Sequence, residues 1–153
     1  MPVSAPHTSG TPPHHGILPP APLADAPLRR ALDASDNAIV MSNSTRHVVY
    51  VNEGFTRLFG FSPAEVLGKY LSDVLLGPHS DPGLLSEIRD GIDQQGGFHI
   101  ETLLYSKAGQ PRWVSMMINA SDEASGGPGG SITILTDITL TKMHEVLQKR
   151  VLE

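Results

Sequence analysis

Residues 50–68 constrain the fold of this chain most strongly, because they place a strand and two short helices directly after one another. The apolar strand residues end at Asn52, whose side chain can accept a hydrogen bond from a backbone N–H near Phe55 and so cap a helix. Gly60 follows at a position where a helix can end in the left-handed conformation. This order predicts a strand that runs without a loop into a short helix.

A second helix start follows at once. Ser62 and Glu65 have the spacing of a capping box, and Pro63 stands at the first helical position, where its missing N–H does no harm. Gly68 is the next stop signal. The residues therefore predict two short helices in succession after the strand.

The rest of the pattern adds strands on both sides of one longer helix. The helix is expected over residues 83–90, with Asp81 as its cap and one apolar face. The turn at residues 107–110 joins two strands as a hairpin. The predicted strands, each an apolar or alternating run, are residues 38–42, 47–51, 98–105, 112–120 and 131–137.

The two ends of the chain differ from this middle part. Residues 1–25 are rich in Pro, Ser, Gly and His, cannot bury enough apolar surface to fold, and predict a disordered leader without an export signal. Residues 26–36 predict a short cap helix. Residues 140–153 carry apolar residues at helical spacing and predict an amphipathic connector helix suited to a coiled coil. Residues 37–139 form the domain between them.

This order of elements, closed by the segment Thr136-Asp137-Ile138-Thr139, resembles a PAS domain. The resemblance implies an α+β fold: a five-stranded antiparallel sheet with short helices on one face, the N-terminal helix on the other face and a connector helix at the end. A pocket would lie between the sheet and the short helices. PAS domains are sensor and docking modules, so the resemblance points to a bound cofactor or a partner.

Composition excludes several other functions. The chain has no Cys, so neither a disulfide nor a cysteinyl adduct can form. The net charge of −5, without a basic stripe, argues against nucleic acid as a partner. No apolar stretch is long enough for a membrane span, and we expect a cytoplasmic protein. No catalytic triad or phosphate-binding loop is evident, because the glycines of residues 126–130 lack the Lys of a P-loop. The chain is therefore not expected to be an enzyme.

Strand alternation divides the sheet residues into an inner and an outer set. The inner set would line the pocket together with helix residues, and Asn52 and Trp113 are further candidates, although a capping role suits Asn52 better and alternation turns Trp113 outward. The candidate cofactor-binding residues are Asn52, Phe59, Val74, Leu85, Ile88, Phe98, Ile100, Thr102, Leu104, Trp113, Val114, Met116, Ile118, Thr133 and Leu135.

Residues 76–92 and 103–113 further resemble the flavin-binding LOV branch of the PAS family. Where LOV domains carry the photoreactive Cys, this chain has Leu71 or a neighbour. Leu104, Val114 and Leu135 replace the polar side chains that read the pyrimidine edge of the flavin. The resemblance thus implies a non-covalent flavin, FAD, that senses redox state or oxygen without LOV photochemistry. Backbone groups or the polar residues Thr102, Ser115, Asn119 and Thr133 would then bind the ring.

Two alternatives to flavin stay open. One is a cofactor-free module for dimerisation and signal relay, which the apolar replacements favour. The other is a haem gas sensor, for which His79, just before the longer helix, would be the metal ligand; the helix itself has no His. The exit segment resembles PAS segments of bacterial proteins that make or break cyclic di-GMP, which implies a GGDEF/EAL output domain C-terminal to this one.

The outer set is also apolar. It contains Leu103, Trp113, Met117, Ile132 and Ile134, and a monomer rarely leaves such a patch bare. The helix of residues 26–36, with Leu28 and Leu32 on one side, is the expected cover. It would come either from the same chain, as a lid, or from a second chain in a homodimer, and the sequence leaves both open.

Overall fold

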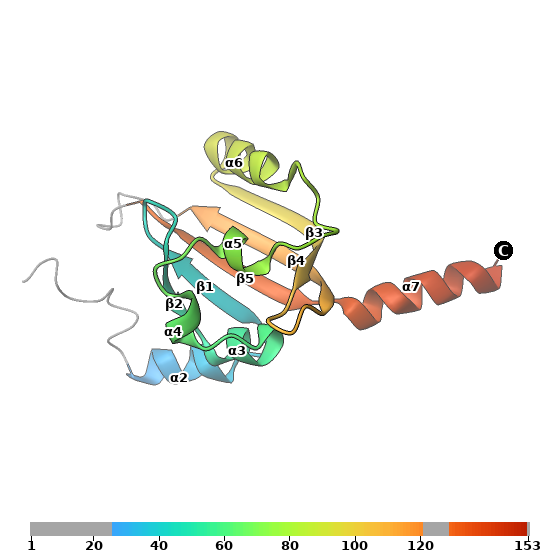
Figure 1. Ribbon diagram of the computed structural model, residues 1–153, viewed down its shortest axis with the longest axis horizontal. Helices are drawn as coiled ribbons and strands as arrows, with labels where there is room; N and C mark the ends of the chain where they lie inside the picture. Colours follow the sequence, from blue (N-terminus) through green and yellow to red (C-terminus); the bar gives the residue numbers. More distant parts are fainter. Residues whose placement is uncertain (1–25, 121–128, 153) are drawn as a thin grey trace, which may run out of the picture.

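The computed structural model describes residues 26–120 and 129–152, which form one antiparallel sheet with helices packed on it (Figure 1). The strand order is β2-β1-β5-β4-β3. All neighbours are antiparallel, and β4 pairs with both β3 and β5. The strands are β1 (Ala38–Ser42), β2 (Val48–Val51), β3 (Gly97–Tyr105), β4 (Pro111–Ala120) and β5 (Ser131–Asp137). The predicted α+β class and the five-stranded sheet are confirmed.

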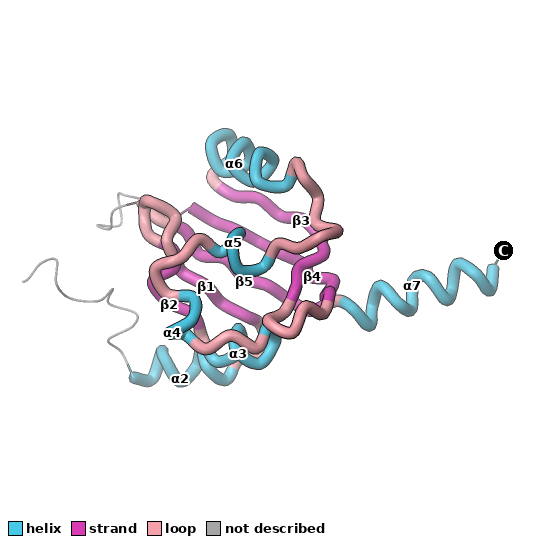
Figure 2. Tube along the Cα trace, in the orientation of Figure 1, coloured by secondary structure: helices cyan, strands magenta, loops and turns pink. Residues whose placement is uncertain are grey.

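Four helices lie between β2 and β3 in sequence and cover one face of the sheet. They are α3 (Glu53–Phe59), α4 (Pro63–Val66), α5 (Leu71–Leu75) and α6 (Leu84–Gln95). Figure 2 shows α4 and α5 in front of the sheet, with α3 near its lower and α6 near its upper edge. The core fills the space between these helices and the sheet, where Phe55 and Phe59 of α3 meet inner strand residues such as Val114 and Leu135. We call this helix-covered side the inner face.

Residues 50–68 fold as their capping and stop signals predict. The side-chain oxygen of Asn52 accepts a hydrogen bond from the Phe55 N–H at 3.0 Å, and Gly60 ends α3 at φ 83°, where only glycine is free of strain. Ser62 and Glu65 form the capping box. The helix α4 is shorter than expected, because it already ends at Val66.

The structure corrects the prediction for the longer helix. α6 runs past residue 90 to Gln95 and ends at Gly96, which has φ 76°. Leu84 is 1% exposed and Leu85 is 47% exposed, so Leu84 and not Leu85 faces the core. The Asp81 carboxylate accepts from the Gly83 N–H instead of capping the helix with its side chain. α5 was not among the predicted elements.

The N-terminal helix α2 (Ala26–Ala34) does not lie where it was expected. It packs beside α3: the Asp33 carboxylate accepts from the Glu53 N–H at 2.9 Å, and the Arg57 guanidinium donates to the carbonyl oxygens of Asp33 and Ser35. Leu28 stays exposed. Among the described residues, α2 therefore forms no lid over the outer apolar residues.

The C-terminal helix α7 (Thr139–Leu152) projects from the end of β5 away from the sheet, as Figure 1 shows. Its apolar side chains Met143, Val146 and Leu147 are exposed. None of the helices that the structure describes is both long and apolar enough to cross a membrane. The predicted disordered leader, residues 1–25, lies outside the described residues.

Candidate functional site

The strand residues predicted to face the pocket do share the inner face. Thr102, Leu104, Val114, Met116, Ile118, Thr133 and Leu135 are buried there, and Phe98 and Ile100 are partly buried. The pairing register aligns them: Thr102 lies opposite Val114, Ile118 opposite Thr133, and Met116 opposite Leu135. The sequence thus predicted the lining of this face correctly for the strands.

Two hydroxyl groups stand out on this otherwise apolar face. The side chains of Thr102 and Thr133 are 5% and 4% exposed and belong to the few buried polar residues of the domain. Ser115 and Asn119, which were expected to help bind a flavin, instead point to the outer face, where the Ser115 hydroxyl contacts the His99 ring at 2.9 Å. Polar recognition on the inner face therefore depends on Thr102 and Thr133 and on backbone groups.

Packing is uneven across the inner face. On the side of α3, Phe55, Phe59 and Val40 are completely buried. On the side of α6, Leu84 is buried, but other apolar residues of α5, α6 and β3 are only partly buried; these are Val74, Ile88, Ile92, Phe98 and Ile100. A ligand bound on the inner face beside α6 would cover these partly exposed apolar side chains.

Two residues of this region belong to the expected apolar face of the helix but were not among the candidate cofactor-binding residues. Leu84 and Ile92 continue the Ile88 face of α6 at helical spacing. The signal was present in the sequence, since residues 84, 88 and 92 are one helical turn apart. The adjacent Leu85 obscured it, because two neighbouring leucines fit two different helix phases.

Asn52 has a structural role that leaves no room for a cofactor. Its side-chain oxygen accepts from the N–H groups of Ile39 and Phe55, and its NH₂ group donates to the carbonyl oxygens of Leu32 and Asn37. An amide side chain has two donor and two acceptor positions, and all four are occupied. Asn52, 1% exposed, therefore ties α2, β1 and α3 together.

Trp113 lies on the outer face and anchors the exit of the domain. The backbone N–H of Trp113 donates to the Thr139 hydroxyl at 3.1 Å, and its backbone carbonyl accepts from the Ile138 N–H at 2.8 Å. The Lys142 ammonium lies 5.4 Å from the centre of the indole ring and pairs with Glu101 at 2.6 Å. The hydrogen bond that the Lys142 ammonium donates to Glu101 raises the pKa of Lys142. The first turn of α7 is thereby fixed to β3 and β4.

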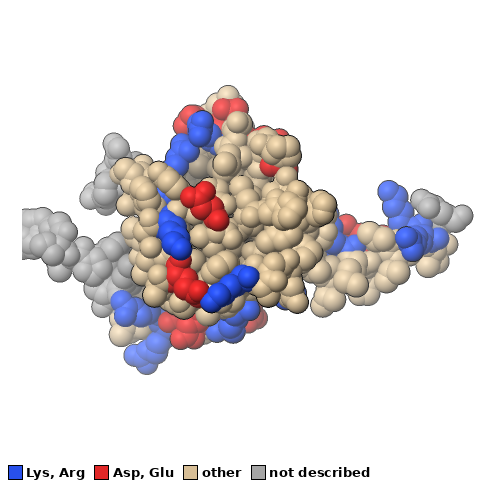
Figure 3. Space-filling model, viewed as in Figure 1, with Lys and Arg blue, Asp and Glu red and all other residues tan. Residues whose placement is uncertain are grey.

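His79 is exposed in the turn before α6, and its backbone N–H donates to the Tyr105 hydroxyl at 3.0 Å. Within the described residues, no group of three or more His, Asp or Glu side chains could hold a metal ion. On the face drawn in Figure 3, basic and acidic side chains are mixed.

The sheet, its helical cover and the fixed exit helix form a small α+β domain. The family model described as PAS domain matches residues 36–140, and the chain belongs to this family. Rice (Oryza sativa subsp. japonica) phototropin-2 is 31% identical over 108 residues, which cover 69% of this chain and 12% of the phototropin. The human voltage-gated inwardly rectifying potassium channel KCNH3 is 32% identical over 96 residues, 62% of this chain and 9% of the channel.

Solved structures agree with this fold. An RNA-binding light-oxygen-voltage receptor has a TM-score of 0.72 at 25% identity and covers 94% of this chain and 41% of its own. A light-oxygen-voltage domain studied with a flavin analogue has a TM-score of 0.67 at 24% identity, over 84% of this chain and 96% of its own. The domain is thus a LOV-like PAS sensor domain, and it spans only a small part of the curated relatives it matches.

Proposed function

We propose that this PAS domain holds a non-covalent flavin between the inner face and α6 and passes the redox state of that flavin to α7. The observation that carries this proposal is the uneven packing of the inner face. Apolar side chains from α5, α6 and β3 point inward beside α6 and remain partly exposed. A planar apolar ring system placed there would bury their remaining exposed surface, which contributes a part of the roughly 1.5–3 kcal/mol gained when a whole apolar side chain is buried.

The residues present suit a flavin in part. Ile88, Ile92 and Ile100 can cover the apolar part of the isoalloxazine ring, and the hydroxyls of Thr102 and Thr133 can bind its polar edge. When bound, the cofactor supplies reversible reduction. The similarity to rice phototropin-2 and to light-oxygen-voltage structures, one of them studied with a flavin analogue, supports this ligand class. FAD as the particular form remains a prediction.

The chain offers a route from the inner face to the exit helix. Thr133 and Leu135 lie on β5, which leads directly to Asp137. The Asp137 carboxylate accepts from both the N–H and the hydroxyl of Thr139, and the same hydroxyl accepts from Trp113 on β4. A ligand state that interacts differently with β5 would therefore bias the start of α7. The proposed receiver is a C-terminal output domain, for which the sequence resemblance suggests cyclic di-GMP synthesis or breakdown.

A second copy of the chain is the partner we propose for the outer face. Trp113, Met117 and Ile132 are 38%, 45% and 40% exposed, and α2 leaves them uncovered. Two outer faces packed together would bury these side chains and place two α7 helices close to each other. Their exposed residues Met143, Val146 and Leu147 could then form a helical seam.

One observation favours a cofactor-free relay module instead. Leu104, Val114 and Leu135, at the positions where the LOV resemblance places the flavin-reading side chains, are buried in the protein's own core. In that case the partly buried residues near α6 would remain a shallow apolar surface. Haem is the third possibility, with the exposed His79 as its only suggested ligand.

The absorption spectrum of the purified protein tests all three. We expect flavin bands at about 370 and 450 nm and FAD as the flavin released by denaturation and identified by chromatography. Ile100→Trp, at a partly buried position of the proposed site, should occupy the space of the flavin and release it while circular dichroism stays native. Ile132→Trp on the outer face is the matched control and should retain it.

Three results would contradict the proposal. A colourless protein that does not bind added FAD or FMN would establish the cofactor-free module. A Soret band lost in His79→Ala would establish haem. Equal flavin content in Ile100→Trp and Ile132→Trp would place the ligand away from the inner face.

A further inference from the structure

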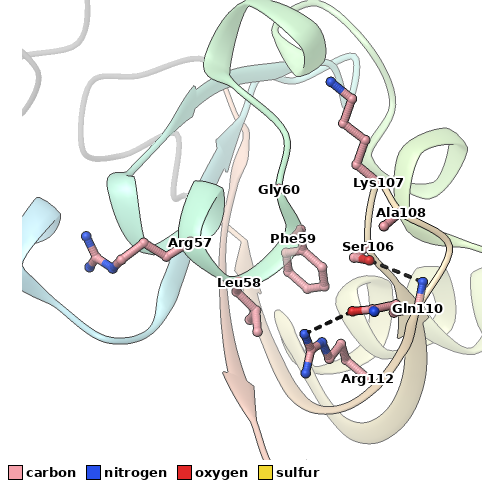
Figure 4. A pocket seen from close by; sticks show the side chains of 9 residues that line it. All are labelled: Arg57, Leu58, Phe59, Gly60, Ser106, Lys107, Ala108, Gln110 and Arg112. Carbon is pink, nitrogen blue, oxygen red and sulfur yellow. Dashed lines mark hydrogen bonds between the residues drawn. The ribbon is translucent and has the colours of Figure 1, made fainter.

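An open groove of about 550 Å³ lies between the end of α3 and the β3–β4 hairpin (Figure 4). Its volume lies within the range of small-molecule sites. Leu58, Phe59 and Gly60 form one wall, and hairpin residues, including Ser106, Gln110 and Arg112, form the other. Its polar and basic character distinguishes it from the inner face near α6, and the flavin proposal does not explain it.

The residues that line the groove include three cations and no Asp or Glu. Two of these cations are already compensated. Lys107 pairs with Glu65 at 2.5 Å, and Arg57 pairs with Glu53 at 3.6 Å and also donates to two backbone carbonyls. In Figure 4 both side chains turn away from the centre of the groove.

Arg112 is different. Its guanidinium turns toward Leu58 and Phe59 in Figure 4, and no ion pair to it exists within the described part of the chain. Among the described residues, its guanidinium makes one hydrogen bond, from Nη2 to the Gln110 side-chain oxygen at 3.3 Å. Its Nε is buried and has no hydrogen-bond partner. Leaving a buried charged donor without a partner costs free energy that a ligand can recover.

We propose that this groove binds the oxyanion of a small organic molecule, a carboxylate or a phosphate, through Arg112. A guanidinium presents Nε and Nη as a planar fork that matches both oxyanions with two parallel hydrogen bonds. Arg112 Nε is the half of this fork that has no partner in the protein, and the polar residues Gln110 and Ser106 line the same groove. The single uncompensated cation suits one anionic group.

The groove also lies close to the attachment of the exit helix α7. Arg112 is the second residue of β4 and precedes Trp113, which binds the exit segment through Thr139. An anion bound at Arg112 would therefore act within one residue of the attachment of α7. This site would let the domain respond to a soluble metabolite independently of any ligand on the inner face.

The test is a titration of ¹⁵N-labelled protein with sodium phosphate and, separately, with sodium succinate, at ionic strength held constant with NaCl. We expect saturable amide shifts of Gly60, Ser106 and Gln110 with at least one anion, and the tighter of the two identifies phosphate or carboxylate as the group recognised. Arg112→Gln should weaken binding at least about tenfold, as expected for loss of a charge-assisted bidentate contact.

Two further variants distinguish binding at Arg112 from a general effect of net charge. Lys149→Gln removes one exposed charge on α7 and should bind as the native protein does. Arg112→Lys keeps the charge, loses the fork, and should also bind several-fold more weakly. The proposal is overturned if neither anion gives saturable shifts at the groove, or if Arg112→Gln or Arg112→Lys binds like the native protein.

Discussion

Replacement of Asn52 by Ala should destabilise this domain more than any other single polar deletion we consider. The substitution removes four hydrogen bonds, to the backbone of Leu32, Asn37, Ile39 and Phe55, with donor–acceptor distances of 2.6, 3.1, 2.8 and 3.0 Å. A typical intramolecular hydrogen bond contributes about 0.5–1.5 kcal/mol, so the loss sums to about 2–6 kcal/mol. Domains of this kind unfold at about 5–15 kcal/mol, so the effect takes a large share of the total.

Urea unfolding followed by circular dichroism measures this loss. Asn43→Ala is a matched control, because the Asn43 side-chain oxygen accepts three hydrogen bonds, from the N–H and hydroxyl of Thr45 and from the His47 N–H, in a turn near the surface. Water can replace those contacts, so we expect a loss of at most about 1 kcal/mol. Equal losses for Asn52→Ala and Asn43→Ala would refute the reasoning that burial makes the Asn52 network costly to break.

Three further predictions concern the core, the stability at acidic pH and the outer face. Leu84→Ala should lower the free energy of unfolding measured with urea by about 2–5 kcal/mol, while Leu85→Ala should lower it little, because only Leu84 is buried. A larger loss for Leu85→Ala than for Leu84→Ala would mean that Leu85 faces the core, as the sequence predicted. The hydrogen bond from Lys107 lowers the pKa of Glu65 to about 2, so its stabilising effect is complete above the ordinary pKa of about 4.5 and fades as pH falls toward 2. The urea midpoint of the native protein should therefore drop more steeply over this window than that of Glu65→Gln, and parallel curves would count against the pairing. Ile134→Asp should shift the native protein from dimer to monomer in sedimentation at micromolar concentration, and a native monomer would remove the proposed homodimer.

Local signals predicted most of the fold because they act within a few residues. The strands β1 and β5 and the helix α3 follow from alternation, from the Asn52 cap and from the Gly60 stop. The helix phase of α6 did not follow, since Leu84 and Leu85 are equally apolar and only tertiary packing decides between them. Gly96 marked the true end of α6, but the stop assumed at residue 90 concealed that signal.

The candidate site was predictable only as far as strand alternation reaches. Alternation assigned the inner residues of β3, β4 and β5 correctly, while it turned Ser115 and Asn119, counted as flavin ligands, to the other face. The position of α2 depends on contacts of Asp33 and Arg57 that join residues far apart in sequence, and no local pattern encodes them. The Arg112 groove is likewise built from α3 and a distant hairpin, so it becomes visible only in three dimensions.

The attachments of α7 indicate how the proposed ligand sites could act on the proposed C-terminal output domain. Its first turn is held by three strands at once: β5 continues into it, β4 binds Thr139 through Trp113, and β3 binds Lys142 through Glu101. Beyond Lys142 the helix is exposed and extends for about 1.5 Å per residue. A small change in the relative position of these strands would therefore move the far end of α7 farther than its base. The same three strands carry the inner face, and β4 also carries Arg112. Either proposed ligand site could therefore shift α7 through the strands that it contacts.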